Sequence, residues 1–235
     1  MLHGLAFGDL SKEPSCQLCH VNAANQQAIL YVGSRPSTGR VQLKLLLLEG
    51  LQKDHRVLEI GCGALVAGIP IMSYLSPNHY VGIEPNRWLI DASLKVAGNR
   101  RVVNQKNPLF IYNMDFDATP LNIGFDYIIA HSIMSHAAHQ QLPLFLENGA
   151  KVLNKSGKLI FSIRLTEPNA YGHQGAPQET QSPEWIYPGN SFFHKQTVVE
   201  EASKWFSHVE HKQAYTQLIT SDDPSAFHDW FVLTK

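Results

Sequence analysis

The stretch that decides the fold is Arg56-Val57-Leu58-Glu59-Ile60-Gly61-Cys62-Gly63-Ala64-Leu65-Val66-Ala67-Gly68. An apolar run with β-branched residues that leads into closely spaced glycines is typical of a buried parallel strand that turns into a helix. Glycine lacks a Cβ atom, so the backbone of such a turn is open to close approach by a ligand. The stretch therefore predicts a cofactor pocket at the end of its strand.

A second apolar run, Tyr80-Val81-Gly82-Ile83-Glu84-Pro85-Asn86, leads into a carboxylate. Glu84 follows the glycines by about 20 residues, which is where the acid that binds ribose hydroxyls falls in nucleoside-binding α/β folds. Two neighbouring hydroxyls are matched by the two oxygens of one carboxylate. Glu84 is accordingly the predicted ribose ligand.

Together the two runs resemble motifs I and II of the class I S-adenosylmethionine-dependent methyltransferases, whose first strand reads approximately Val-Leu-Asp/Glu-x-Gly-x-Gly. The residues that match are Val57, Leu58, Glu59, Gly61 and Gly63. The resemblance extends over roughly residues 40–165 and a C-terminal pair of strands. Leu65 stands where a third glycine is usual, and we expect Gly68 to supply the flexibility of the loop instead.

A nicotinamide-dependent oxidoreductase is the nearest alternative, because its fold also combines a glycine-rich turn with a ribose-binding acid. That fingerprint requires a glycine three positions after the second glycine, where a pyrophosphate reaches the helix N-terminus. Val66 stands at this position and favours S-adenosylmethionine, which carries no phosphate. Leu65 in place of glycine leaves a third hypothesis, a non-catalytic module that binds S-adenosylmethionine without turnover.

Composition limits the partners that the chain can have. At 235 residues, with 44% hydrophobic and 17% charged residues, it can bury one sizeable core as a single domain. The formal net charge is −1 and no basic block occurs, so we expect no nucleic-acid partner. No apolar run is long enough to span a membrane, and three cysteines fit a reducing compartment. We expect a cytoplasmic protein without a membrane partner.

Strand and helix patterns alternate along the chain, which predicts a parallel sheet with helices on both faces. Strands are expected over 57–60, 80–83, 109–113, 126–130 and 158–163, and helices near 22–50, 66–75, 86–97, 138–153 and 197–206. In the family, two further strands such as 209–214 and 230–234 form an edge hairpin. The expected fold class is α/β: a Rossmann-like, doubly wound, seven-stranded, mostly parallel sheet with an antiparallel edge strand and a lid insertion.

The segment 166–195 does not fit this alternation and is rich in proline and aromatic residues. A loop of this length inside a compact domain is usually functional, and it follows the fifth strand at the edge where ligands bind. We expect a substrate lid, the alternative being a surface excursion that packs its own aromatics. The expected single domain, 1–235, thus comprises an N-terminal helical cap (1–50), a cofactor-binding core (51–165), the lid (166–195) and a C-terminal helix with the edge hairpin (196–235).

The resemblance implies which residues hold the cofactor. Glu59 lies where a strand-end carboxylate helps to hold the ammonium group of S-adenosylmethionine, and the turn at 61–63 would present backbone to its methionine part. Asp115-Phe116 resembles the pair in which the acid meets the adenine amino group and the next residue flanks the ring. For Asp115, a helix cap or a turn is the alternative. The full implied set is Glu59, Gly61, Cys62, Gly63, Glu84, Pro85, Asp115, Phe116 and His131.

Residues just after the fourth strand border the transferred methyl group in the family, so His131 and His136 are the candidates for a general base or for positioning the acceptor. A histidine pKa near 6.5 suits proton removal at neutral pH. The chain has 12 histidines, and a hydrogen-bonded structural role is the alternative for either one. The candidate contacts to the substrate, in or next to the lid, are Tyr171, His173, Trp185 and His194.

Metal ligation is not expected. Cys16 and Cys19 have the spacing of one edge of a zinc site, but no second Cys-x-x-Cys pair follows, so two free thiols are the favoured interpretation. His136 and His139 would share a helical face without a neighbouring acid cluster, which disfavours metal-dependent methyl transfer. We predict no metal cofactor.

The acceptor is expected to be a small molecule. Enzymes that methylate amino groups of nucleic acids often carry Asp/Asn-Pro-Pro-Tyr after the fourth strand, and His131-Ser132-Ile133-Met134 does not match. This mismatch, the near-neutral charge and the expected lid favour methyl transfer to a small acceptor. An oxygen is the first choice of acceptor atom, with nitrogen or carbon close behind.

Overall fold

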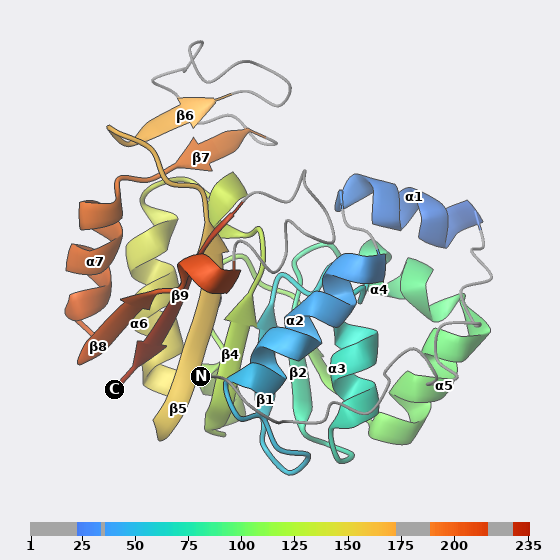
Figure 1. Ribbon diagram of the computed structural model, residues 1–235. Coiled ribbons are helices and arrows are strands. Elements are labelled where there is room, and N and C mark those ends of the chain that lie inside the picture. Colours follow the sequence, from blue (N-terminus) through green and yellow to red (C-terminus); the bar gives the residue numbers. More distant parts are fainter. Residues whose placement is uncertain (1–22, 34–35, 173–188, 216–227) are drawn as a thin grey trace.

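The computed structural model describes residues 23–33, 36–172, 189–215 and 228–235 (Figure 1). A seven-stranded sheet runs through it in the order β3-β2-β1-β4-β5-β9-β8. The strands are β1 (Val57–Ile60), β2 (Tyr80–Ile83), β3 (Leu109–Ile111), β4 (Phe125–Ala130), β5 (Leu153–Ile163), β8 (His208–His211) and β9 (Asp229–Thr234). β1 to β5 are parallel, and β9 is antiparallel to both β5 and β8. The predicted fold, a mostly parallel sheet with a C-terminal edge hairpin, is confirmed.

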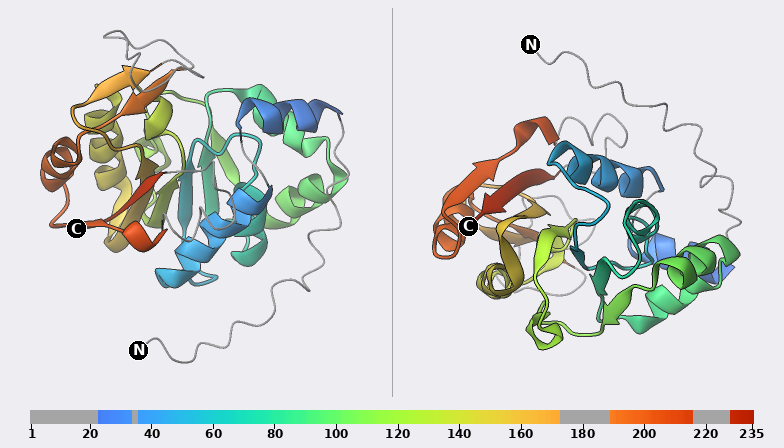
Figure 2. Two further views of the ribbon diagram at one scale, coloured as in Figure 1. Left: turned by 45° about the horizontal axis from the view of Figure 1, so that its top comes forward. Right: turned by 90° about the horizontal axis from the view of Figure 1, so that it is seen from below.

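Helices cover both faces of this sheet (Figure 2). One face carries α2 (Pro36–Leu48), α3 (Gly68–Tyr74), α4 (Arg87–Leu94) and α5 (Ala97–Lys106), and the other carries α6 (Gln141–Val152) and α7 (Lys195–Ser203). The remaining α-helix of the described residues, α1 (Ala23–Tyr31), lies against α4. Strand side chains alternate between the faces, so Val57 and Leu58 belong to different buried clusters.

Some element bounds differ from those expected. The expected helix 86–97 is two helices, α4 and α5, because Val96 between them has an extended backbone with φ −79° and ψ 119°. β5 begins at Leu153, directly after α6, because Leu153 is itself extended with ψ 132°. Two short 3-10 helices, η3 (Thr119–Leu121) and η4 (Met134–His136), lie on either side of β4.

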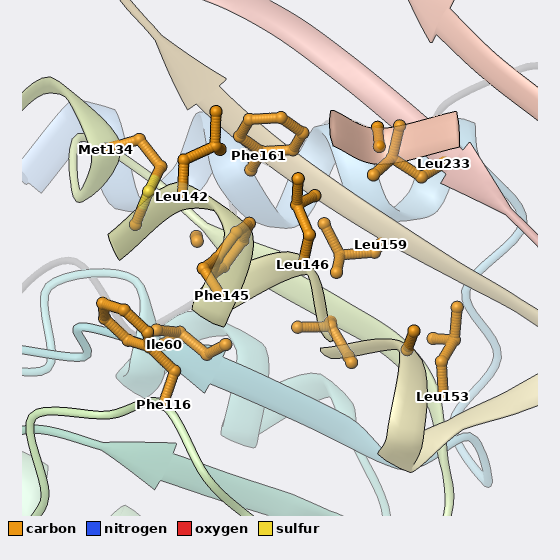
Figure 3. Close-up of a cluster of buried hydrophobic side chains, with 14 of the residues drawn as sticks. Ile60, Phe116, Met134, Leu142, Phe145, Leu146, Leu153, Leu159, Phe161 and Leu233 are labelled. Atoms are coloured by element: carbon orange, nitrogen blue, oxygen red, sulfur yellow. The ribbon is translucent and has the colours of Figure 1, made fainter. Parts of the chain in front are cut away.

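A cluster of apolar side chains fills the space between the sheet and helices α6 and α7. Figure 3 shows Leu142, Phe145 and Leu146 reaching from α6 toward strand residues that include Leu159 and Phe161. The Phe145 ring lies 5.8 Å from that of Phe116 and 5.4 Å from that of Phe161, measured between centroids. Phe145 therefore links the core to the loop after β3, which contributes to the site described below.

We expect Phe145→Ala to lower the free energy of unfolding by about 3–5 kcal/mol, because a fully buried aromatic ring is lost and a cavity remains. Urea unfolding followed by circular dichroism measures this change. Phe145→Leu keeps most of the buried volume and should cost clearly less. Equal losses for the two variants would contradict the proposed role of the ring in packing.

The described parts of the predicted lid form a small hairpin. β6 (Ala170–Gly172) pairs antiparallel with β7 (Asn190–Phe192). In Figure 1 this hairpin and α1 lie at the same end of the molecule, beyond the carboxyl ends of the parallel strands. His173 and Trp185, the central residues of the predicted lid, lie outside the described residues, and so does the Cys16/Cys19 pair.

Within the described ranges, none of the helices combines the length and the apolar character that crossing a bilayer requires. The same ranges contain no group of three or more His, Cys, Asp or Glu side chains arranged to hold a metal ion.

Candidate active site

A cavity of about 600 Å³ lies at the carboxyl ends of β1, β2 and β4. Ligands of open α/β sheets bind at this edge, and the volume falls within the range of about 300–1,000 Å³ usual for small-molecule sites. Its walls come from the turn after β1, the end of β2, the loops after β3 and β4, and helices α1 and α2. Of the residues predicted to hold a cofactor or to act in catalysis, the cavity is lined by Glu59, Gly61, Cys62, Gly63, Glu84, Pro85, Phe116, His131 and His136.

The turn after β1 is held against β2 by its own backbone. The amide groups of Gly61 and Cys62 both donate to the carbonyl oxygen of Ile83, at 2.8 and 3.1 Å. Gly61 has φ 73°, and a Cβ atom there would stand 1.9 Å from Cδ1 of Ile133. Glycine is therefore favoured at this position by the backbone conformation, and a larger residue would also have to displace the end of the Ile133 side chain.

The predicted role of Gly68 in loop flexibility is wrong. Leu65 itself adopts the left-handed conformation, with φ 58°, although it is a buried non-glycine residue. Gly68 instead opens α3, and a Cβ atom on it would lie 2.6 Å from the hydroxyl of Tyr80. The glycine thus allows the close approach of Tyr80, which in turn contacts Glu59.

Glu84 ends β2 at the wall of the cavity and is only 6% exposed. Its Oε2 accepts a hydrogen bond from the Gly63 amide at 3.0 Å, and its Oε1 accepts one from the Asn86 amide at 2.8 Å. Burial raises the pKa of Glu84, while the two amide donors lower it. Each oxygen can accept a further bond, so both remain able to receive a hydroxyl.

Glu59 is the second buried carboxyl group of the cavity. Its Oε2 accepts a hydrogen bond of 2.6 Å from the hydroxyl of Tyr80. Burial raises the pKa of Glu59 to about 8, the Tyr80 bond lowers it, and the charge of Glu84 raises it further. At neutral pH the group is therefore largely protonated, and a bound cation would favour its ionised form.

The structure separates Asp115 from Phe116. Phe116 has φ 63° and lines the cavity, with its ring perpendicular to that of Phe145. Asp115 does not line the cavity: its Oδ1 accepts the amide of Asp117 at 3.3 Å, and its carbonyl oxygen accepts the side chain of Asn148. The predicted contact of Asp115 with adenine is thus not supported, because its carboxylate closes the turn that carries Phe116.

His131 is packed under the cavity. Its ring stacks on Trp230 at 5.3 Å with an interplanar angle of 3°, and Nε2 of Gln42 lies 3.3 Å from its Nδ1. Burial lowers the pKa of His131 to about 4, so the ring is neutral at pH 7. An amide nitrogen is a donor, so Nδ1 accepts and the ring proton lies on Nε2. That Nε2 is buried and has no hydrogen-bond partner among the described residues.

His136 has the opposite arrangement of its ring nitrogens. Nδ1 lies 2.9 Å from the carbonyl oxygen of Gly189, which can only accept, so Nδ1 carries the proton. Burial lowers the pKa of His136, the Gly189 bond raises it, and the nearby Arg164 lowers it. His136 is therefore neutral at pH 7 with a lone pair on Nε2. Both cavity histidines are neutral, but the Nδ1 lone pair of His131 already accepts from Gln42, whereas the lone pair of His136 is on Nε2, so His136 is the better candidate for a base.

Two predicted substrate contacts serve the structure instead. The hydroxyl of Tyr171 accepts the His139 amide at 2.8 Å, and the two rings stack at 3.9 Å, which ties the hairpin to the loop after β4. His194 is the N-cap of α7: its Nδ1 accepts the Gln196 amide at 3.2 Å, and its Nε2 contacts Glu167. Neither lines the cavity. The substrate role of His194 is therefore not supported, because both ring nitrogens are engaged.

Sequence reasoning missed Gln42 and Ile133, which also line the cavity. Gln42 is buried on α2 among leucines. A polar residue on the apolar face of a helix is the one sequence signal by which it could have been found. Ile133 carries no such signal, because its role is steric and depends on its distance from Gly61.

The strand ends of this Rossmann-like sheet surround a cavity, and a buried carboxylate stands at the end of one strand. This arrangement is typical of nucleoside-binding α/β proteins. Residues 58–159 match a family model described as a methyltransferase domain. The match agrees with the resemblance of residues 57–63 and Glu84 to the class I S-adenosylmethionine-dependent methyltransferases, a family whose cofactor is S-adenosylmethionine. The predicted resemblance, the enzyme class and the cofactor are confirmed.

Solved structures share this fold at low sequence identity. An S-adenosylmethionine-dependent methyltransferase from Clostridium acetobutylicum has a TM-score of 0.63 and 10% identity, and the match covers 91% of this chain and 99% of that one. The CcbJ methyltransferase from Streptomyces caelestis has a TM-score of 0.59 and 12% identity, covering 86% and 91%. Magnesium protoporphyrin IX methyltransferase from Synechocystis PCC 6803, with bound S-adenosylmethionine, has a TM-score of 0.56 and 12% identity, covering 90% and 84%.

Proposed function

We propose that this methyltransferase transfers a methyl group from S-adenosylmethionine to a hydroxyl oxygen of a small-molecule acceptor. The observation that carries the proposal is one cavity lined both by two buried carboxyl groups, Glu59 of β1 and Glu84 after β2, and by two histidines that follow β4, His131 and His136. The carboxyl groups suit the cofactor, and the histidines suit the acceptor.

The residues present fit the cofactor. Both oxygens of Glu84 have remaining capacity for ribose hydroxyls, Glu59 can receive a cationic ammonium group, and Phe116 contributes an aromatic ring to the lining of the cavity. Asp115 does not line the cavity. In its place, Asn113 and Met114, which line the cavity after β3, would lie near the adenine ring of the cofactor. When bound, the cofactor supplies a methyl group that a positively charged sulfur has already activated.

The two histidines have different tasks in this proposal. His136 removes the proton of the acceptor hydroxyl, because its Nε2 carries the lone pair. His131 is held by Gln42 at the wall of the cavity, and its ring shapes the space that the acceptor occupies. Alignment of the nucleophile and exclusion of water supply the rest of the rate acceleration.

A small acceptor is supported by the size of the cavity and by the charge of the chain. A volume of about 600 Å³ has to hold the reacting parts of cofactor and acceptor together. The near-neutral net charge offers no electrostatic attraction for a nucleic acid. Structural neighbours include a glycopeptide N-methyltransferase and magnesium protoporphyrin IX methyltransferase, which are named for acceptors other than nucleic acids.

Calorimetry with S-adenosylhomocysteine, followed by turnover with S-adenosylmethionine and a panel of hydroxylated small molecules, tests the proposal. We expect binding, and formation of a methyl ether together with S-adenosylhomocysteine and a proton. Enhanced fluorescence of reduced nicotinamide instead of S-adenosylhomocysteine binding would favour an oxidoreductase. Cofactor binding without turnover of any acceptor would favour a non-catalytic module.

With an acceptor in hand and S-adenosylmethionine kept saturating, we expect kcat/KM for the acceptor to rise with pH and to level off by about pH 7. The base form of His136 is the neutral one, and burial lowers its pKa below the ordinary value of 6.5, so the neutral form predominates at neutral pH. His136→Gln should lower kcat by about 10²–10⁴-fold and remove this inflection. A stopped-flow or discontinuous assay across about pH 5–9 measures both.

His139→Gln is the matched control, since His139 follows in the same loop but does not line the cavity. It should keep the inflection. An unchanged pH profile in His136→Gln would contradict the assignment of the base.

A further inference from the structure

The β6–β7 hairpin is bonded to the loop that carries the proposed base, His136. We propose that Ser191 of β7 is a positioning residue for His136. By tying β7 to this loop, Ser191 keeps the carbonyl oxygen of Gly189 at Nδ1 of His136, so that the lone pair of the ring stays on Nε2. The inference rests on the proposed function and deepens it, because it gives the described strands of the predicted lid a task in catalysis.

Two neighbouring residues of the loop after β4 are bonded to β7 and the residue before it. Nδ1 of His136 donates to the carbonyl oxygen of Gly189 at 2.9 Å. The hydroxyl of Ser191 donates to the carbonyl oxygen of Ala137. Both loop residues, His136 and Ala137, line the cavity. The hairpin is therefore bonded to the wall of the cavity at the position of the proposed base.

The partner strand β6 contacts the same loop. Tyr171 pairs with Ser191 across the hairpin, and directly opposite residues of an antiparallel pair point to the same face. The Tyr171 hydroxyl accepts the His139 amide at 2.8 Å, and Nε2 of His139 lies 3.1 Å from the carbonyl oxygen of Phe192, to which it donates. Both strands of the hairpin thus hold the loop in one register.

Ser191 is the fully buried member of these contacts. Because water does not reach its hydroxyl, removal of the hydroxyl would leave the carbonyl oxygen of Ala137 without this donor in a closed site. A shift of β7 away from the loop is then favoured. Gly189 precedes Ser191 by two residues, so such a shift also carries its carbonyl oxygen away from His136.

The contact with Gly189 decides the tautomer of His136. A neutral imidazole has one donor and one acceptor nitrogen, and the hydrogen bond of one nitrogen fixes the role of the other. A carbonyl oxygen can only accept, so the proton stays on Nδ1 while Gly189 is in place. Once this contact is lost, the proton can occupy Nε2, and the ring then has no lone pair there to take the proton of the acceptor hydroxyl.

Kinetics of Ser191→Ala with saturating S-adenosylmethionine test the inference. We expect kcat to fall by about 10–10²-fold, as a displaced catalytic group does, with KM for the acceptor changed less than about threefold. The affinity for S-adenosylhomocysteine should be unchanged. Ser73→Ala is the matched control, because the Ser73 hydroxyl also donates to a backbone carbonyl oxygen, that of Ile69 at 2.7 Å, but lies on α3. It should leave kcat unchanged.

NMR of protein labelled with ¹⁵N-histidine gives a readout that a merely structural role of Ser191 would not change. The ring signals of His136 are assigned by their absence in His136→Gln. They should show the proton on Nδ1 in the wild-type protein and in Ser73→Ala, and a population protonated at Nε2 in Ser191→Ala. Ser191→Cys keeps a similar shape with a weaker donor, so its kcat and its tautomer population should lie between wild type and Ser191→Ala.

A kcat of Ser191→Ala equal to that of Ser73→Ala would overturn the inference, and so would a His136 that stays protonated only at Nδ1 in Ser191→Ala. Circular dichroism separates loss of the fold from loss of positioning, and Ser191→Cys replaces Ser191→Ala in the test if the latter does not fold. Absence of methyl transfer by the wild-type protein would instead overturn the proposed function. The NMR comparison would then still decide whether Ser191 fixes the proton of His136.

Discussion

Glu84→Ala is expected to weaken the binding of S-adenosylhomocysteine by about two to four orders of magnitude. The carboxylate is buried at the wall of the cavity and has one free acceptor position on each oxygen. Hydrogen bonds to a charged group contribute about 1.5–3 kcal/mol each, and two are lost at once. Isothermal titration calorimetry at constant pH measures the change in Kd.

Two controls accompany this variant. Glu84→Gln keeps the shape and one acceptor oxygen, so its effect should lie between wild type and Glu84→Ala. Asp115→Ala removes a carboxylate that follows β3 but does not line the cavity, and it should change Kd less than about threefold. Because Glu84 also accepts the Gly63 and Asn86 amides, circular dichroism of the free variant checks that it is folded. An Asp115→Ala loss as large as that of Glu84→Ala would contradict our account of the cofactor site.

The affinity for S-adenosylhomocysteine is expected to rise by about tenfold per pH unit between about pH 5.5 and pH 7.5. In the free protein the pKa of Glu59 is raised to about 8, mainly by burial, so the group is protonated over this range. An ammonium group bound against it favours the carboxylate and lowers that pKa, so binding expels a proton. A rise in pH removes protons and therefore promotes binding. The pH range over which the affinity rises ends near the pKa of a free α-amino group, about 7.7–8.0, because the ligand's ammonium group then loses its proton.

Calorimetry in two buffers with different enthalpies of ionisation counts the proton released. Glu59→Gln is uncharged at every pH and should show weaker binding with a nearly flat pH dependence. Burial also raises the pKa of Glu84, so a smaller slope of the same sign should remain at the acid end. A wild-type affinity that is independent of pH would contradict the protonated state of Glu59.

The same raised pKa affects folding in the absence of cofactor. Glu59 binds its proton more tightly in the folded protein than in the unfolded chain, where its pKa is near 4.5. The stability that it contributes is therefore complete below about pH 4.5 and is lost as the pH rises toward about 8. A ligand that pairs with the ionised carboxylate reverses this loss, so thermal stabilisation by S-adenosylhomocysteine should be larger at pH 8 than at pH 6.

The fold could be predicted because its signals are local. The strand and glycines at 57–63, the strand-end acid Glu84 and the alternation of apolar runs all reflect which backbone shapes and buried faces the residues tolerate. The bounds of α4 and α5 were less predictable, because a single extended residue, Val96, separates two helices. The cavity residues at the ends of β1 and β2 could be predicted for the same reason. They belong to the same continuous stretches of sequence as the motifs that indicated them.

The amino-acid sequence by itself determined the sheet, the position of the cavity at its strand ends and the two carboxyl groups at the cavity wall. Tertiary structure alone decided that Asp115 turns away, that His194 caps a helix, and that Gln42 gives His131 a different protonated nitrogen from His136. The physical reason is the range of the interactions involved. Backbone conformation and burial patterns are written in neighbouring residues, whereas the pKa and proton position of a side chain depend on groups that folding brings from distant parts of the chain.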